Sequence, residues 1–456
     1  MKDRFGYDWS KIKGTQFWRL PHIGRRMFFR HMATALSGYF LLPTRPMETV
    51  AKAAVTPVGT AKNCLFILLT GAPSHTDTFD LKEGSWTPSY FNPTSYGDLR
   101  FPQGLMPNLA NHMDSIAFVR SIRAWAAAHG IAQTWMQIGR NPSSGLSKIA
   151  PHIGSVVAME LGGDPSKRVL PAFISLNASD GPGAGYFPPD DAPFYINPNG
   201  GGLPNSTHPG GGAVLDRRYG MKLDIDAQLE ISPDLGPALG EVFKDNLAAR
   251  RVMYSDSVNQ VFNFDQATRN TYGNTSFGNA CITARNLFRK NLGTRFVQIS
   301  FGSWDHHVNI YAPNANLQSM SKQFDAGLGA LLTDLKQDGT LDQTLIVAVG
   351  EFGRTVGPLT VNAGRDHHVQ QTALFAGAKV VGTRAIGSTD QSGAFLADPG
   401  WSRNREIKPE DIEATIYSAL GIDWTTVRHD DPLNRGFEYV PFSEQDVYGP
   451  INELWG

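Results

Sequence analysis

Short, unbroken apolar runs constrain the fold of this 456-residue chain more than any other feature of its sequence. Residues 64–69 and 344–349 carry almost no polar side chain, and they lack the polar–apolar alternation of a half-exposed strand. Strands that are buried on both faces have this composition, which is typical of parallel sheets in α/β proteins. We therefore expect both segments to be central, buried strands of one sheet.

Segments with helical spacing alternate with strand-like runs along the rest of the chain. Further strands are expected at 169–176, 296–300 and 373–376, and helical segments at 108–113, 131–138, 151–161, 224–262, 278–292, 319–336 and 409–420. This alternation favours an α/β fold with a mostly parallel sheet. Because no convincing linker divides the chain, we expect a single domain over residues 54–456, in which the Gly- and Pro-rich segment 179–214 is a long loop.

The charge balance and the cysteine content exclude some classes of protein. The chain has 41 Lys and Arg residues against 42 Asp and Glu residues, a formal net charge of −1. It therefore has no electrostatic reason to bind nucleic acid or an anionic membrane. Its two cysteines, Cys64 and Cys281, cannot form a disulfide scaffold or a cysteine-based zinc site.

The N-terminal segment has the features of an export signal in the right order. Arg25-Arg26 precedes an apolar stretch from Met32 to Leu42, and Ala51-Lys52-Ala53 follows as a small-x-small cleavage site. This order is typical of a bacterial twin-arginine signal, and the apolar stretch is too short to span a membrane, which takes about 20 residues. We expect residues 1–53 to address the protein to the twin-arginine export machinery, with no stable membrane span and a periplasmic or extracellular location. The alternative is an amphipathic arm that stays attached.

Ionisable side chains follow the expected strands at their C-terminal ends, the edge where open α/β sheets bind ligands. The turn 71–80 contains Asp77, and the segment after strand 296–300 contains Asp305 and His307. In an extended segment Asp305 and His307 point the same way, with His306 facing away, so the pair can share a divalent cation. The alternatives are ordinary turn chemistry for Asp77 and a simple hydrogen bond between Asp305 and His307.

Two more clusters follow strand 344–349. Glu351 is a candidate metal ligand or base, with Arg354 as a clamp for an oxyanion; alternatively, the two form a structural ion pair. Asp366 precedes a second His-His doublet, which begins at His367. The two doublets, His306-His307 and His367-His368, each follow an aspartate, and this pattern indicates a functional site.

We therefore predict a metal site at this edge. Asp305, His307, Glu351 and His367 are expected to converge on one divalent metal ion, with Asp77 and Asp366 in or beside the coordination sphere. Imidazoles combined with carboxylates favour Zn, Mn or Fe, whereas Ca or Mg, which prefer oxygen ligands, are the less favoured options.

Read in order, the motifs resemble those of one bacterial family, the domain-of-unknown-function family 1501, which is similar to the sulfatases within the alkaline phosphatase-like superfamily. The matching segments lie between residues 62 and 425, at 71–80, 119–122 leading to His129, 151–155, 304–307, 351–355, 364–367 and 411–421. The resemblance implies an alkaline phosphatase-like three-layer α/β sandwich, in which helices flank a central, mostly parallel sheet. It also implies a metal site at the C-terminal edge of the strands.

The resemblance further implies a chemistry, because related enzymes hydrolyse phosphate or sulfate esters with divalent cations and an activated nucleophile. Asp305, His307 and His367 resemble ligands of the superfamily, whereas Thr70 and Phe352 stand where an aspartate and a histidine are usual. A formylglycine nucleophile is not expected, because no Cys-x-Pro-x-Arg signature is present.

The candidate catalytic residues are then Ser121 as nucleophile, with Thr134 as the alternative nucleophile, His129 near them, and Arg354. Two functions stay open. The first is an exported, metal-dependent hydrolase of phosphate or sulfate esters, with a small-molecule or polysaccharide ester as substrate. The second is a non-catalytic envelope or assembly protein that keeps the fold.

Overall fold

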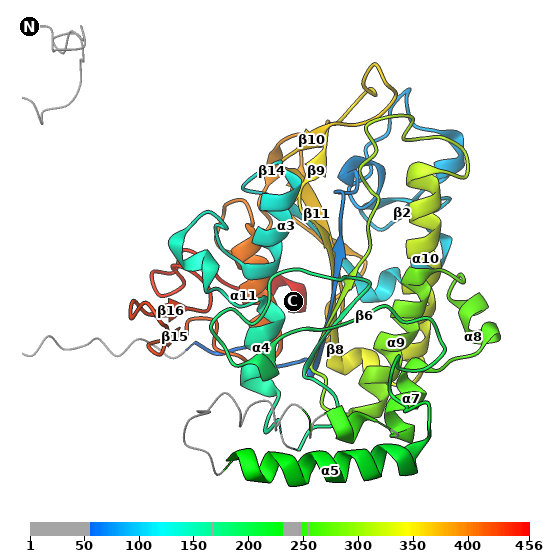
Figure 1. The fold of residues 1–456 in the computed structure, drawn as a ribbon. Helices are drawn as coiled ribbons and strands as arrows, with labels where there is room; N and C mark the ends of the chain where they lie inside the picture. Colours follow the sequence, from blue (N-terminus) through cyan, green and yellow to red (C-terminus); the bar gives the residue numbers. More distant parts are fainter. Residues whose placement is uncertain (1–54, 166, 231–245, 247–248, 254) are drawn as a thin grey trace, which may run out of the picture. The chain divides into compact units, whose positions relative to one another are not determined.

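An eight-stranded sheet forms the middle layer of the structure (Figure 1). Within this sheet only β11 runs antiparallel to its neighbours, so β1, β4, β7 and β8 all point the same way. The strand order is β12 (Arg384–Ile386), β4 (Ile116–Arg123), β11 (Gln370–Gly377), β8 (Thr344–Gly350), β1 (Asn63–Leu69), β7 (Phe296–Ser300), β5 (Phe173–Leu176) and β6 (Phe194–Ile196). The expectation of a mostly parallel sheet is confirmed.

The computed structural model describes residues 55–456 except 166, 231–245, 247–248 and 254. The predicted export signal at 1–53 lies outside the described residues. The described chain belongs to one unit, Val55–Gly456.

The two apolar runs singled out in the sequence are neighbouring central strands. β1 and β8 pair in parallel, with Leu65 opposite Ile346, and every residue of both strands is buried. Alternate residues face opposite layers: Leu65 and Ile67 pack into one hydrophobic cluster, and Phe66 and Leu68 into another. An apolar side chain is therefore favoured at every position, which explains the unbroken runs.

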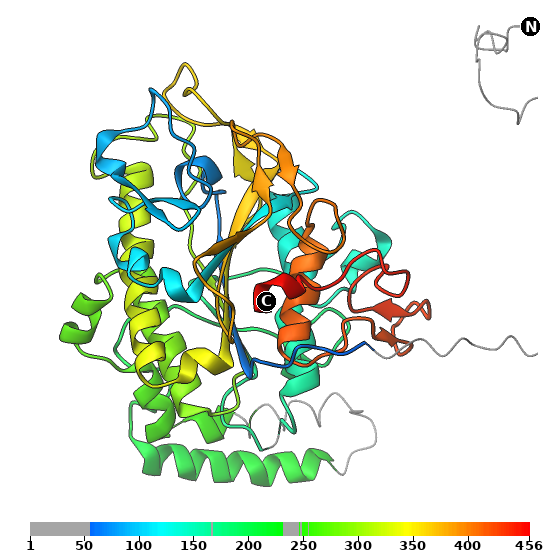
Figure 2. The same ribbon diagram turned by 180° about the vertical axis from the view of Figure 1, so that it is seen from behind.

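Helices cover both faces of the sheet and complete a three-layer α/β sandwich (Figures 1 and 2). One face is covered by α2 (Pro107–Ala110), α7 (Asp256–Phe262), α9 (Ser276–Lys290) and α10 (Asn316–Gln337), with α8 (Gln266–Thr271) beside them. The other face is covered by α3 (His129–Ile138), α4 (Ile153–Leu161) and α11 (Pro409–Ala419). The predicted fold class is therefore confirmed.

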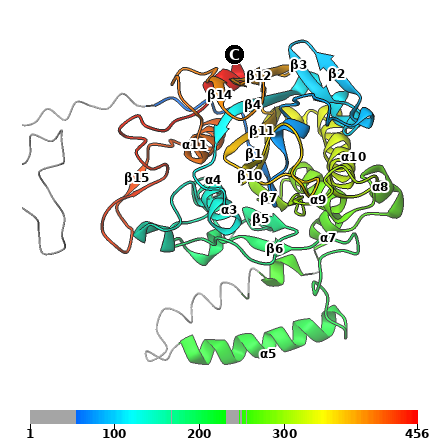
Figure 3. The ribbon, with the colours of Figure 1, turned by 90° about the horizontal axis from the view of Figure 1, so that it is seen from above.

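Three elements differ from the sequence-based expectation. Strand β4 was not expected, although its residues 116–119 are an apolar run that pairs with β11. The expected loop 179–214 contains edge strand β6, and helix α5 (Gly212–Glu230) begins at its end. Helix α5 lies apart from the layers in Figures 1 and 3, and none of its described residues is buried. The polar sequence of this helix therefore agrees with its exposure to solvent.

In the described part of the chain, four short two-stranded sheets lie outside the central sheet. They pair β2 (Pro93–Tyr96) with β3 (Leu99–Pro102), β9 (Gly353–Arg354) with β10 (His367–His368), β13 (Ser388–Thr389) with β14 (Leu396–Asp398), and β15 (Val427–Arg428) with β16 (Phe437–Glu438). Across the described residues, no helix combines the length and the apolar character that a membrane span requires.

The strand directions bring chain segments that are distant in sequence to one edge of the sheet. The C-terminal ends of β1, β4, β7 and β8 meet there with the N-terminal end of the antiparallel strand β11. The segments that leave or enter these strands carry nearly all of the site residues predicted from the sequence.

Candidate metal centre

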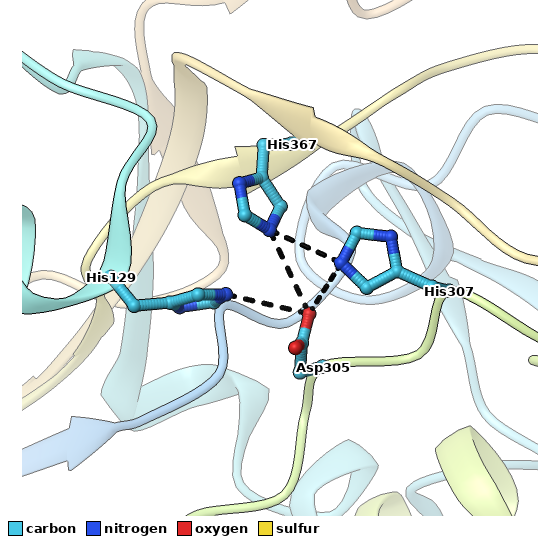
Figure 4. Close-up of side chains that lie close together, drawn as sticks. All are labelled: His129, Asp305, His307 and His367. Atoms are coloured by element: carbon cyan, nitrogen blue, oxygen red, sulfur yellow. Dashed lines mark hydrogen bonds and ion pairs between the residues drawn. The ribbon is translucent and has the colours of Figure 1, made fainter.

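Four side chains converge at this edge of the sheet: His129, Asp305, His307 and His367 (Figure 4). One potential ligand atom from each lies within 4.8 Å of the other three. Asp305 Oδ1 is 2.9 Å from His307 Nε2, 3.5 Å from His129 Nε2 and 3.8 Å from His367 Nε2. The Nε2 atoms of His307 and His367 are 3.2 Å apart. Ligands placed tetrahedrally around zinc are separated by about 3.3 Å, so this spacing fits one metal ion.

Each of the four groups comes from a segment at the end of a strand. Asp305 and His307 follow β7, and their side chains point the same way because they are two residues apart. His129 is the first residue of α3, just after β4. His367 lies in β10, directly before β11. The sheet topology therefore assembles the group.

The second ring nitrogen of each histidine has an oxygen partner. Nδ1 of His129 is 2.7 Å from Glu351 Oε1, Nδ1 of His307 is 2.8 Å from Asp366 Oδ1, and Nδ1 of His367 is 2.8 Å from the carbonyl oxygen of Ala127. In the neutral ring these oxygens accept the Nδ1 proton, so the lone pair of each ring is on Nε2, the nitrogen that can bind a metal. The Nε2 of His307 also lies 3.2 Å from Nη1 of Arg354. All three Nε2 atoms face the shared point.

Glu351 is the most buried member of this surrounding layer. Its side chain is fully buried, and Oε1 accepts hydrogen bonds from His129 Nδ1, from the Gly71 backbone at 2.9 Å and from Gln133 Nε2 at 3.2 Å. Its position at the end of β8 therefore fixes the orientation of the His129 ring.

Arg354 holds Asp305 in place. Its Nη2 donates to Asp305 Oδ1 at 2.5 Å and also to the Gly71 carbonyl, while its Nε donates to the Ala72 carbonyl at 2.9 Å. Burial acts to raise the pKa of the Asp305 carboxyl, but the hydrogen bond and the charge of Arg354 outweigh it and lower that pKa. Asp305 is therefore held as a carboxylate.

The loops that carry His307 and His367 are joined by backbone hydrogen bonds. Arg365 N donates to His306 O at 3.0 Å, and Ile310 N donates to Ala363 O at 2.8 Å. A Cβ on Gly364 would lie 2.0 Å from the His307 carbonyl, so only a glycine allows this approach. These contacts fix the two loops, and with them His307 and His367, relative to each other.

The structure brings Asp305, His307 and His367 together, and it places Glu351 and Asp366 behind histidines, outside the group of four. Asp77 lies elsewhere: its two oxygens bind the buried Arg365 side chain, and Oδ1 also accepts from Tyr311. The ligand roles predicted for Glu351, Asp366 and Asp77 stay predictions, but their contacts favour supporting roles.

Two candidate catalytic residues are enclosed by protein. Ser121 lies in β4 and is fully buried, and a Cβ on Gly387 would lie 2.6 Å from its hydroxyl. Arg354 is 1% exposed, and its guanidinium donors are directed at protein acceptors. His129, in contrast, belongs to the group itself. Sequence reasoning did not place it among the ligands, although it follows the apolar run 116–119 that should have marked a strand.

The residues fit a divalent cation. His129 Nε2 is buried and has no hydrogen-bond partner among the described residues, as a metal-binding nitrogen requires. Three imidazoles and one carboxylate suit Zn, Mn or Fe better than Ca or Mg. The four side chains are 28–44% exposed, so the centre is open to solvent.

The fold and the site define an α/β sandwich protein with a three-histidine, one-aspartate centre at the C-terminal edge of its sheet. The family described as "Protein of unknown function (DUF1501)" matches residues 61–437. The chain belongs to this family, which confirms the resemblance seen in the sequence motifs.

The comparison with solved structures gave matches of low identity, among them the following three. The lipoteichoic acid synthase LtaP from Listeria monocytogenes is 11% identical, with a TM-score of 0.37 over 85% of this chain and 79% of that chain. The sulfatase PsFucS1 from Pseudoalteromonas sp. is 11% identical, with a TM-score of 0.38 over 81% and 68%. An alkaline phosphatase superfamily protein from Vibrio parahaemolyticus is 14% identical, with a TM-score of 0.37 over 81% and 69%. The comparison with curated proteins gave no match.

Proposed function

We propose that this protein is a metal-dependent hydrolase of phosphate or sulfate esters. The observation that carries the proposal is the convergence of three imidazole Nε2 atoms and the Asp305 carboxylate on one solvent-open point, with Nδ1 of every ring held by an oxygen. Groups oriented in this way are preorganised to hold a cation. The resemblance of the motifs to those of alkaline phosphatase-like enzymes supports phosphate and sulfate esters as the substrate class.

The roles of the side chains follow from their contacts. When bound, a divalent cation polarises an ester oxygen and lowers the pKa of a bound water to about 7. His129, His307, His367 and Asp305 hold the cation, and Arg354 fixes the Asp305 carboxylate. The four side chains are 28–44% exposed, so the substrate in this proposal, a small-molecule or polysaccharide ester, comes to them from solvent.

The nucleophile in this proposal is a solvent water. Ser121 and Thr134 were the candidates from the sequence. The Ser121 hydroxyl is fully buried beside Gly387, and the Thr134 hydroxyl donates to the Gly130 carbonyl at 2.8 Å. A water molecule can reach the exposed side of Asp305, which is 44% accessible. Replacement of Ser121 by alanine is expected to leave turnover unchanged. A loss of turnover would instead identify the Ser121 hydroxyl as the nucleophile.

Elemental analysis combined with ester hydrolysis tests the proposal. The purified chain should contain one equivalent of Zn, Mn or Fe and should hydrolyse an aryl phosphate or an aryl sulfate. Asp305→Asn and His367→Ala should lose both metal and turnover, whereas His429→Ala, a histidine outside the centre, should keep both. Stoichiometric metal without turnover on either ester class would favour the alternative, a non-catalytic envelope or assembly protein.

We also propose that the protein is exported, on the strength of Arg25-Arg26, the apolar stretch and the Ala51-Lys52-Ala53 site. Replacement of both arginines by lysine should retain the protein in the cytoplasm. Unchanged export of that variant, or a mature chain that still begins at Met1, would contradict this proposal.

A further inference from the structure

A chain of hydrogen bonds begins at α4 and leads toward the metal centre. The Gly154 backbone N–H donates to His152 Nδ1 at 2.8 Å, so Nδ1 is the acceptor nitrogen of this ring. The ring proton is therefore on Nε2, which donates to Gln298 Oε1 at 2.7 Å. Burial lowers the pKa of His152 to about 3, so the ring is neutral at ordinary pH and keeps this donor–acceptor pattern.

The chain continues from the sheet into helix α3. Because Gln298 Oε1 accepts from His152, its amide nitrogen is free to donate, and it donates to Gln137 Oε1 at 3.1 Å. Gln137 Nε2 donates to the Gln133 carbonyl at 3.1 Å, and Gln133 Nε2 donates to Glu351 Oε1 at 3.2 Å. Each bond therefore donates in the same direction, toward Glu351 and the His129 ring.

The middle of this chain is buried in an apolar setting. Gln298 is 3% exposed, Gln137 8% and His152 1%, and the His152 ring packs 4.7 Å from the Phe173 ring. An unpaired amide at such a place costs free energy, so a complete set of bonds favours one arrangement of α3 on the sheet.

The segment that leads into α3 is joined to the segment of His367 by two hydrogen bonds, from Ala124 N to Val369 O at 2.9 Å and between His367 Nδ1 and Ala127 O at 2.8 Å. Asp305, His307 and His367 lie on segments that are joined to one another or to the sheet by backbone hydrogen bonds. His129 opens α3, where the N-cap residue Ala128 supplies no side-chain hydrogen bond. Side chains further along α3 therefore add to the contacts that place His129.

We propose that the chain His152–Gln298–Gln137–Gln133–Glu351 is a positioning device that sets the place of His129 in the metal centre. Gln298, Gln137 and Gln133 are positioning residues, since they act on the cation through His129 and do not touch it. This proposal rests on the proposed metal centre and not on the identity of the ester.

The test compares metal affinity and protein stability in the full-length chain. Gln298→Met and Gln137→Met keep the side-chain size and remove the hydrogen bonds. Both are expected to weaken Zn²⁺ binding about tenfold, the lower end of the effect seen for groups that orient ligands. The matched control is Thr283→Val, which removes a fully buried hydroxyl on α9 at the other face of the sheet and should leave Zn²⁺ affinity unchanged. If Gln298→Met does not fold, Gln133→Met, at a half-buried position, must show the same loss.

A second measurement separates this proposal from the proposed function. In metal-free protein, nitrogen-15 NMR of labelled histidine should show His129 protonated at Nδ1, and Gln298→Met should show a mixture of ring forms. Unchanged Zn²⁺ affinity and unchanged His129 signals in Gln298→Met would overturn the positioning role. A wild-type protein that binds no metal would instead overturn the metal-dependent function, while the NMR comparison would still decide the role of the chain.

Discussion

Gly71 and Asp305 lie so close that a Cβ on Gly71 would sit 2.8 Å from the backbone nitrogen of Asp305. Gly71 also has a φ of +94°, a backbone conformation that residues with a side chain rarely adopt. Its N–H donates to Glu351 and its carbonyl accepts from Arg354. The chain at the end of β1 thus contacts the candidate metal centre through a residue that has no side chain.

Gly71→Ala is therefore expected to damage the centre as well as the fold. The positive φ alone should cost about 1–2 kcal/mol of stability, and the added methyl group must displace Asp305. We expect Zn²⁺ affinity to fall about tenfold, measured by competition with a chelator. Gly163→Ala, which also has a positive φ but no atom within 4 Å of the added Cβ, is the matched control and should keep its affinity.

His307→Ala should remove metal and thermal stability together. A ligand whose free concentration is a hundred times its Kd stabilises a folded protein by about 2.7 kcal/mol. A variant that cannot bind the ligand lacks this stabilisation. Melting curves with and without added Zn²⁺ should differ for the wild type and coincide for the variant. Zn²⁺-dependent stabilisation that persists in His307→Ala would mean that His307 is no ligand.

Glu351→Gln tests the carboxylate behind His129. The substitution keeps the side-chain shape but removes the charge that favours the Nδ1 proton, so metal affinity should fall by about 10–100-fold. Glu83→Gln, an exposed surface change, should have no effect. An unchanged affinity in Glu351→Gln would show that the backbone alone sets the orientation of His129.

Acid should destabilise the protein through its buried histidines. Burial lowers the pKa of His75 to about 4 and that of His152 to about 3, whereas both titrate near 6.5 in the unfolded chain. Their contribution to stability is therefore present above pH 6.5 and is lost as the pH falls toward the folded values, by about 1.4 kcal/mol per pH unit for each histidine. Urea unfolding measured from pH 7 to pH 4 should show this slope, and His75→Gln should reduce it.

Glu413 should make the protein less stable as the pH rises, which is the opposite of the effect of the two histidines. Burial raises the pKa of its carboxyl to about 8, although the charge of Arg140 opposes the rise. Stability from this group is present below the unfolded value near 4.5 and is lost as the pH rises through 8. Glu413→Gln should therefore unfold at higher urea than the wild type at pH 8, and the difference should vanish at pH 4.5. An advantage that is equal at both pH values would show that the carboxyl is not titrating.

The central strands and three of the four site residues were predictable because their signals are local. An apolar run such as 64–69 can be stable only where both faces are covered, and Asp305 and His307 share a face whenever their segment is extended. The direction of the strands then brings His367 to the same edge. These inferences need only periodicity and the general rule about strand ends.

The remaining features depend on contacts that no local pattern records. Glu351 was predicted as a ligand and lies behind His129, because whether a carboxylate faces the shared point or stands behind a histidine is decided by where α3 packs. Asp77 lies beside a strand end as expected, yet its partner is Arg365, 288 positions along the chain. His129 joins the group because α3 begins at it, and the unrecognised strand β4 is what places that helix start.

The order of the four residues along the chain has a consequence for biosynthesis. His129 is made early, but His367 lies beyond residue 360, after most of the sheet has been synthesised. A ribosome must therefore pass His367 before all four groups exist, and β11, which follows His367 directly, must still join the sheet. The complete group of four therefore exists only late in synthesis, and a cation that needs all four side chains could be held no earlier than that.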